Sequence, residues 1–163
     1  MKQAQMYARR VRQLYNRLIR QFGKPQIPAP TDPLMQLIEG ILAAGAPLSR
    51  AQAVARRLCQ GMVDLNELRV TPPMELAALI GDSVPFAAEK AQRIVNALNA
   101  IRVRQDTLDL SFLQHRGRRE ARDYLESLAG VDRAAAALVV LYGLGGHAVP
   151  VDPVTVLVLK RTG

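Results

Sequence analysis

The residues best suited to chemistry lie late in the chain, where a glycine separates two helical segments. Residues 128–134 read Leu-Ala-Gly-Val-Asp-Arg-Ala, and an apolar run typical of a helix follows them. A tight turn at Gly130 would bring backbone N–H groups close to a phosphate, and the start of the next helix would add its dipole. An ordinary corner between two helices fits the same pattern. These residues alone leave both interpretations open.

Asp152 is the second candidate, since it precedes Pro153 at the start of a predicted helix. An aspartate at this position caps the first N–H groups and contributes about 1 kcal/mol. A capping carboxylate is also free to act on a substrate. His147 has no second metal ligand at a recognisable spacing. His115 lies in a basic turn, 114–119, that either touches phosphate or is a solvated loop. We therefore expect no metal site and no cofactor.

Helical periodicity extends over nearly the whole chain and strand patterns are absent, so the predicted fold class is all-α, a helical bundle. A basic amphipathic helix is expected over 2–22, followed by a connector over 23–33 that contains four prolines. Further helices are expected over about 33–44, 49–61, 85–104, 118–128 and 133–142, with short ones starting at Asp64 and Thr71 and a last one at Pro153. Asp32 and Ser49 are predicted caps. The helix over 133–142 is apolar on every side, which predicts a central position.

The bulk properties narrow the class of protein. A chain of 163 residues fits one domain, with 1–33 as an N-terminal arm and 34–163 as the helical core. No apolar run reaches the length of a membrane span and no signal-peptide core is present, so a cytoplasmic location is expected. The single cysteine, Cys59, excludes an internal disulfide and a self-contained cysteine cluster. The net charge of +8, from 22 Lys and Arg against 14 Asp and Glu, favours a polyanionic partner.

From about Leu14 to Gly163 the chain resembles the endonuclease III branch of the helix-hairpin-helix DNA glycosylase superfamily. The resemblance rests on landmarks that occur in the same order: the helix at 14–22, the proline connector, the helix opened by Asp32-Pro33, Lys90-Ala91 with Ile94, the hairpin at 128–136, and Val151-Asp152. It implies a helical bundle of the helix-hairpin-helix type that binds double-stranded DNA, extrudes a base and breaks its N-glycosidic bond.

The resemblance also implies roles for individual residues. Asp152 would be the catalytic carboxylate that stabilises the cationic sugar formed as the bond breaks. Glu39 aligns with a glutamate that serves as general acid in the adenine-removing branch; the alternative is a partly exposed Glu39 on the outer side of its helix. DNA contacts are expected at Gly130, Val131, Asp132, Arg133, Arg116, Arg118, Arg119, Gly45 and Lys90.

Four positions depart from the family. Ala134 occupies the position of the lysine that forms a Schiff base, so strand cleavage by that route is not expected. Asp132 replaces the second hairpin glycine and would repel phosphate unless it caps the next helix. Gly45 replaces a polar wedge residue, and Val154 replaces a supporting histidine. The family's further helices and iron–sulfur loop are missing, which fits either a short relative or a part of a longer product.

These observations favour a monomeric, monofunctional DNA N-glycosylase of the base-excision-repair type, without AP-lyase activity. A catalytically inactive DNA-binding module that kept the same fold is the alternative. A third interpretation is a helical protein-interaction domain whose charge is incidental. The base that would be removed is left open.

Overall fold

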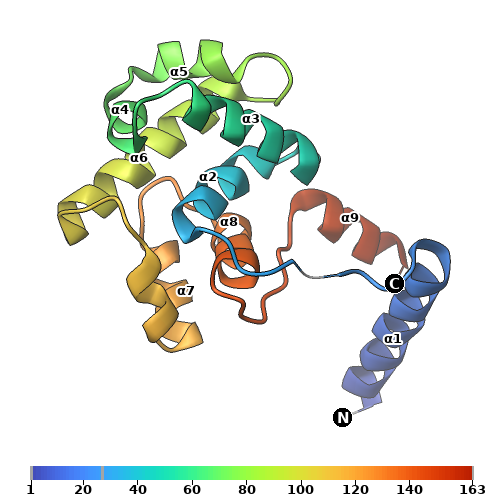
Figure 1. Ribbon diagram of the computed structural model, residues 1–163. Coiled ribbons are helices and arrows are strands. Elements are labelled where there is room, and N and C mark those ends of the chain that lie inside the picture. Colours follow the sequence, from blue (N-terminus) through green and yellow to red (C-terminus); the bar gives the residue numbers. More distant parts are fainter. Residues whose placement is uncertain (1, 27, 163) are drawn as a thin grey trace.

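The computed structural model describes residues 2–26 and 28–162, and within these ranges it contains helices and loops but no strand (Figure 1). The predicted all-α class is therefore confirmed. The α-helices are α1 (Lys2–Phe22), α2 (Pro33–Ala43), α3 (Leu48–Gln60), α4 (Leu65–Val70), α5 (Pro73–Ile80), α6 (Ala87–Gln105), α7 (Arg118–Glu126), α8 (Arg133–Leu138) and α9 (Pro153–Thr162). A 3-10 turn, η1 (Ser111–His115), and a π-helical turn, η2 (Val139–Gly143), complete the set.

Helix α2 is the centre of the bundle and packs against α3, α6, α8 and η2. Its start follows the prediction, because the Asp32 carboxylate accepts the N–H of Leu34 at 3.0 Å and Pro33 occupies the first helical position. Nine of its eleven residues are buried. At Gly40 an added Cβ would lie only 3.0 Å from the Cα of Ala135, so this glycine sets the close approach of α2 and α8.

The apolar segment after the hairpin is central, as predicted, but it is not one regular helix. Ala135, Ala136, Val139 and Val140 are buried. Beyond Val139 the hydrogen bonding widens, and the N–H of Leu144 donates to the carbonyl of Val139 at 3.0 Å. Helix α8 therefore continues into the π-helical turn η2.

The start of α3 and the joint between α4 and α5 differ from prediction, because prolines set these boundaries. Ser49 does not cap α3, which begins one residue earlier, after Pro47. Thr71 ends α4 and donates its own N–H to the carbonyl of Glu67, so α5 begins only at Pro73. A proline already holds the backbone φ that the first turn of a helix needs. The predicted cap at Asp64 is confirmed by its bond to the N–H of Glu67 at 2.8 Å.

Helix α1 stands apart from the bundle, and α9 lies between the two (Figure 1). The stripe of apolar residues predicted to make α1 amphipathic is not buried: Met6, Val11, Leu18 and Phe22 are exposed, and Leu14 is half-buried. Within the described part of the chain, no helix combines the length and the hydropathy needed to cross a lipid bilayer.

Candidate functional site

The hairpin between α7 and α8 is a tight turn that is pressed against α6. The N–H of Val131 donates to the carbonyl of Leu128 at 3.2 Å, and Gly130 has a φ of +85°. A Cβ at Gly130 would collide with the backbone carbonyl of Arg93 in α6. The glycine is thus required by its conformation and by the contact with α6. The approach of a phosphate to this turn, one of the two interpretations of the sequence, stays a prediction.

Arg93 braces this hairpin at two points. Its Nε donates to the carbonyl of Gly130 at 2.9 Å, and its Nη2 lies 2.6 Å from Oδ2 of Asp132. The other carboxylate oxygen of Asp132 accepts the N–H of Ala135 at 2.8 Å, which confirms the predicted cap of α8. The charge of Asp132 is thereby balanced within the protein. The sequence gives no local signal for Arg93, because its partner Asp132 lies 39 positions further along the chain.

A pocket of about 520 Å³ opens next to the hairpin. Its walls come from the end of α2, the loop that follows it, and the first turns of α8 and α9. The lining residues are mostly small or apolar: Gly40, Ala43, Ala44, Gly45, Ala46, Pro47, Leu48, Asp132, Ala134, Leu138, Pro150, Asp152, Pro153, Val154 and Thr155. The pocket falls within the size range of small-ligand sites. Five positions named in the sequence analysis therefore meet in one cavity: Gly45, Asp132, Ala134, Asp152 and Val154.

Asp152 contributes a half-buried carboxylate to this pocket. Its Oδ1 accepts the N–H of Thr155 at 2.6 Å, so it caps α9 as predicted. Hydrogen bonds from the Thr155 side chain and backbone hold the pKa of Asp152 below its usual value. In the described part of the chain no Lys or Arg pairs with this carboxylate within 4 Å. Asp152 therefore presents an unbalanced negative charge to the cavity at neutral pH.

Glu39 is buried but does not line the pocket. Only 7% of its surface is exposed, so it is not the solvent-facing glutamate of the alternative interpretation. Its Oε2 accepts a hydrogen bond from Nε2 of Gln36 at 2.9 Å, and the same nitrogen donates to the hydroxyl of Thr31. Each residue of an α-helix is turned by about 100° from the one before it. The neighbouring Gly40 consequently faces the cavity in place of Glu39.

Lys90 is in the interior, at a position that does not support the expected contact with DNA. The side chain is 2% exposed, and its Nζ donates to the carbonyl of Leu42 at 2.8 Å and to that of Ala44 at 2.5 Å. These carbonyls belong to the end of α2, where they lack helical partners. Burial, followed by the nearby Arg93, lowers the pKa of Lys90 to about 8. Lys90 thus fixes the end of α2 that forms one wall of the pocket.

The predicted DNA-contacting arginines are exposed, and three of them line a second hollow, of about 610 Å³. Its basic residues are Arg118, Arg119, Arg122, Arg133 and His147. The extended segment 149–152 separates the two hollows, because Pro150 and Asp152 line the first and the alternate residues Val149 and Val151 line the second.

Other candidates from the sequence lie outside both hollows. The guanidinium of Arg116 lies over the ring of Phe112, 5.4 Å from its centroid. Tyr124 packs edge-on against Phe112, with the ring centroids 5.3 Å apart. Burial raises the pKa of the Cys59 thiol, whose Sγ lies 3.3 Å from Sδ of Met35. Among the described residues, no three His, Cys, Asp or Glu side chains gather as metal ligands.

Comparison with solved structures identifies the fold, although no protein-family model and no curated protein matches the sequence. A non-covalent endonuclease III–DNA complex superimposes with a TM-score of 0.71 at 24% identity, covering 94% of this chain and 67% of that one. A trapped endonuclease III–DNA covalent intermediate gives 0.67 at 24% identity, covering 89% of this chain. This chain spans 64% of that second structure's length.

The H. pylori 3-methyladenine DNA glycosylase MagIII, bound to 1,N6-ethenoadenine, gives a TM-score of 0.66 at 17% identity, covering 96% of this chain and 73% of that one. All three matches cover at least 89% of this chain. The chain has the fold of the helix-hairpin-helix DNA glycosylases.

Proposed function

We propose that this protein binds double-stranded DNA and hydrolyses the N-glycosidic bond of an extruded nucleotide, without cleaving the strand. The observation that carries the proposal is the unbalanced carboxylate of Asp152 in a pocket beside the braced hairpin. The endonuclease III structures that share the fold are DNA complexes, which supports the same partner.

The chemistry follows from the charge of Asp152. When the base leaves with the electron pair of the glycosidic bond, positive charge develops on the sugar ring. An ionised carboxylate in a small, largely apolar cavity stabilises that charge more than it would in water. A water molecule then adds its oxygen to the sugar carbon and gives up a proton. The lowered pKa of Asp152 suits the role of a charge stabiliser and excludes it as the acid that protonates the base.

The lining of the pocket also indicates which bases would leave. Asp132 and Asp152 are the only ionisable residues among those that line it, and Glu39 is not among them. A neutral base is a poor leaving group unless an acid protonates it. A purine alkylated at N3 or N7 already carries positive charge and needs no acid. We therefore assign alkylated purines as the substrate class, which agrees with MagIII being a 3-methyladenine glycosylase.

The pocket does not support a covalent route through an amine. Ala134 stands where the family places its lysine, and no lysine lines the pocket. Lys90 of α6 has its Nζ committed to the carbonyls of Leu42 and Ala44, at the end of α2. Schiff-base formation at the sugar therefore has no nucleophile among the lining residues.

Release of bases from methylated duplex DNA tests the proposal. We expect release of 3-methyladenine or 7-methylguanine by the wild-type chain, little release of uracil or hypoxanthine, and loss of activity in Asp152→Asn. Asp109→Asn is the matched control, because Asp109 is an exposed aspartate outside the pocket whose pKa is likewise lowered by hydrogen bonds, from Ser111. Equal release by wild type and Asp152→Asn would contradict the assignment.

A catalytically inactive DNA-binding module is the second candidate. Gly45 favours it, because glycine has no side chain to fill the gap left by an extruded base. The cap of α9 also favours it, because this cap already engages Oδ1 of Asp152. Tight, salt-sensitive duplex binding without base release from any damaged duplex would support this module. Binding that is absent at low salt would eliminate both candidates and favour an interaction domain.

A further inference from the structure

The net positive charge of the protein lies on α1 and α9 and not on the body of the bundle. Helix α1 contains six Lys and Arg and no Asp or Glu, and α9 contains Lys160 and Arg161 and no acidic residue. Residues 23–152 contain 14 basic and 14 acidic residues, so their charges cancel. The hairpin and the pocket thus belong to a neutral body, and the +8 belongs to the two helices beside it.

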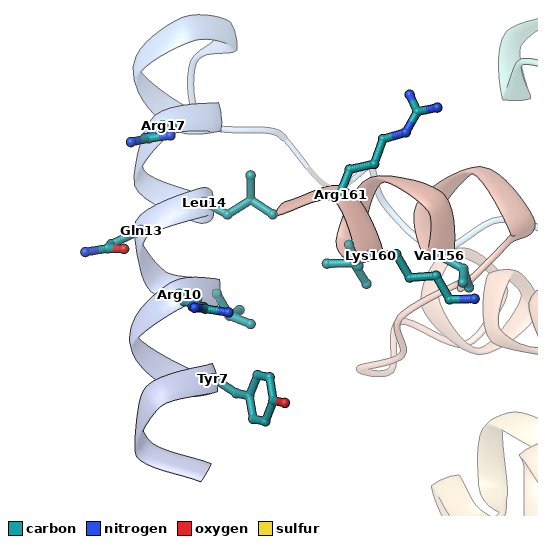
Figure 2. A pocket seen from close by; sticks show the side chains of 10 residues that line it. Tyr7, Arg10, Gln13, Leu14, Arg17, Val156, Lys160 and Arg161 are labelled. Carbon is teal, nitrogen blue, oxygen red and sulfur yellow. The ribbon is translucent and has the colours of Figure 1, made fainter. Parts of the chain in front are cut away.

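These two helices face each other across an open groove of about 720 Å³ (Figure 2). Apolar side chains form its walls: Tyr7, Val11 and Leu14 from α1, and Val156 and Leu159 from α9. Tyr7 and Leu14 point toward α9 in Figure 2. The walls are poorly covered by the protein itself, since Val11 is 60% exposed and Tyr7 54% exposed.

Among the described residues, the rest of the lining is polar, and each charged side chain in it is basic. It consists of Arg10, Gln13, Arg17, Lys160 and Arg161. The groove therefore combines an apolar floor with a cationic rim. Paired apolar surfaces of this size on exposed helices are a sign of an interaction site.

We propose that this groove binds an acidic amphipathic helix of a partner protein. Such a helix would bury leucine-like side chains, spaced at i, i+3, i+4 and i+7, between α1 and α9. Its flanking glutamates would meet the cations of the rim. The groove is distinct from the Asp152 pocket, although α9 contributes its first turn to the pocket and its later turns to the groove.

Three other occupants fit the groove less well. DNA phosphates would pair with the rim but would leave the apolar walls in water. A second copy of this chain would bring α1 and α9 of the same charge against the rim. An anionic membrane is a nearly flat surface, on which a basic amphipathic helix lies with its apolar face down. The walls of this groove face one another, so both cannot lie on one flat surface.

Fluorescence anisotropy with a labelled synthetic helix tests the proposal on the full chain. The probe carries leucines at i, i+3, i+4 and i+7 and glutamates between them. A scrambled peptide of the same composition and a peptide with lysine in place of glutamate are the comparisons. We expect the acidic amphipathic peptide to bind at least about 10-fold more tightly than either. Equal binding of the acidic and the scrambled peptides would overturn the proposal.

Variants locate the binding on the groove. Val11→Asp and Val156→Asp each place a carboxylate on a wall and should abolish the preference for the acidic peptide. Arg17→Glu, Lys160→Glu and Arg161→Glu together turn the four positive side chains of the rim into three negative and one positive. This variant should reverse the preference toward the lysine peptide, which a simple loss of folding would not do. Met74→Asp is the control, because Met74 is an exposed apolar residue of α5, 87% exposed, outside the groove. Circular dichroism checks that each variant keeps its helices.

Three results would contradict the proposal and identify a different occupant. Duplex DNA that displaces the peptide and itself binds less tightly to the charge-reversed variant would assign the groove to DNA. Binding to vesicles of anionic lipid without any preference among the peptides would assign it to a membrane. Self-association that Val11→Asp abolishes in sedimentation would assign it to a second copy. Asp152→Asn should leave peptide binding unchanged. Loss of peptide binding would therefore contradict the groove proposal, whereas loss of base release concerns the glycosylase proposal.

Discussion

Arg93 and Asp132 join α6 to the start of α8 through a contact of 2.6 Å between Nη2 and Oδ2. Nε of the same guanidinium donates to the carbonyl of Gly130, so the Arg93 side chain holds the hairpin at Gly130 and at Asp132. This arrangement accommodates an aspartate in a hairpin that is expected to approach DNA. Both carboxylate oxygens are engaged, one by Arg93 and one by the N–H of Ala135.

Replacing Arg93 by alanine should weaken the hairpin and its binding to DNA. We expect the free energy of unfolding to fall by about 1–2 kcal/mol, because a partly exposed ion pair and a hydrogen bond to a backbone carbonyl are both lost. Without the guanidinium of Arg93, the negative charge of Asp132 would be unpaired and would repel the DNA phosphates. Urea denaturation and duplex binding measure the two effects.

Arg122→Ala is the control for this change. The Arg122 side chain is 53% exposed, and its pairing with Glu126 is a surface interaction one helical turn away. Its loss should change stability by less than about 0.5 kcal/mol. An equal loss of stability in the two variants would show that the brace has no special role.

Gly130→Ala should be among the most destabilising single changes in the chain. The new Cβ would meet the carbonyl of Arg93, and the residue would have to keep a φ of +85°. We expect a loss of about 3 kcal/mol or more in the free energy of unfolding. At Gly117 the φ is −60° and the nearest atom to an added Cβ is 4.0 Å away, so Gly117→Ala should be nearly neutral. Thermal unfolding of both variants gives the comparison.

Local patterns predicted much of this molecule correctly. The caps at Asp32, Asp64, Asp132 and Asp152 are decided by one carboxylate and the N–H groups two or three residues later. Such bonds depend on no distant part of the chain. The central position of α8 also follows from its composition, because a segment that is apolar on every side has no face for water.

Features that depend on tertiary contacts were missed or misplaced. The side of α2 that faces the pocket is set by the crossing with α8 at Gly40, and this crossing turns Glu39 away from the cavity. Lys90 was expected to contact DNA because of the family resemblance, but only 2% of its surface is exposed. Its ammonium is buried because two carbonyls at the end of α2 accept its protons. Arg93 has no local signal at all.

The buried Lys90 should make stability depend on pH in the alkaline range. Its pKa is about 8 in the folded protein, against a usual value of 10.5. Between these values the unfolded chain binds a proton that the folded chain has released. The free energy of unfolding should therefore rise with pH across this window, by at most about 1.4 kcal/mol per pH unit from this group. A neutral amine retains two N–H donors for the two carbonyls.

Lys90→Met provides the reference for this titration. The variant should be less stable than the wild type because the carbonyls of Leu42 and Ala44 lose their donor. The difference in stability between wild type and variant should widen from pH 8 toward pH 10. Urea denaturation at several pH values measures it. A difference that stays constant would mean that Lys90 does not release its proton in this range.

Placing a lysine at position 134 should create a Schiff-base nucleophile. Ala134 lines the same cavity as Asp152, so the amine of Ala134→Lys would enter the pocket in which the sugar is proposed to lie. Borohydride reduction in the presence of duplex DNA with an abasic site should then trap a covalent protein–DNA product, and the wild-type chain should give none. Arg133→Lys is the matched control, because residue 133 lines the hollow on the other side of α8. Equal trapping by both variants would indicate a nonspecific amine reaction, and trapping by neither would place the sugar outside this pocket.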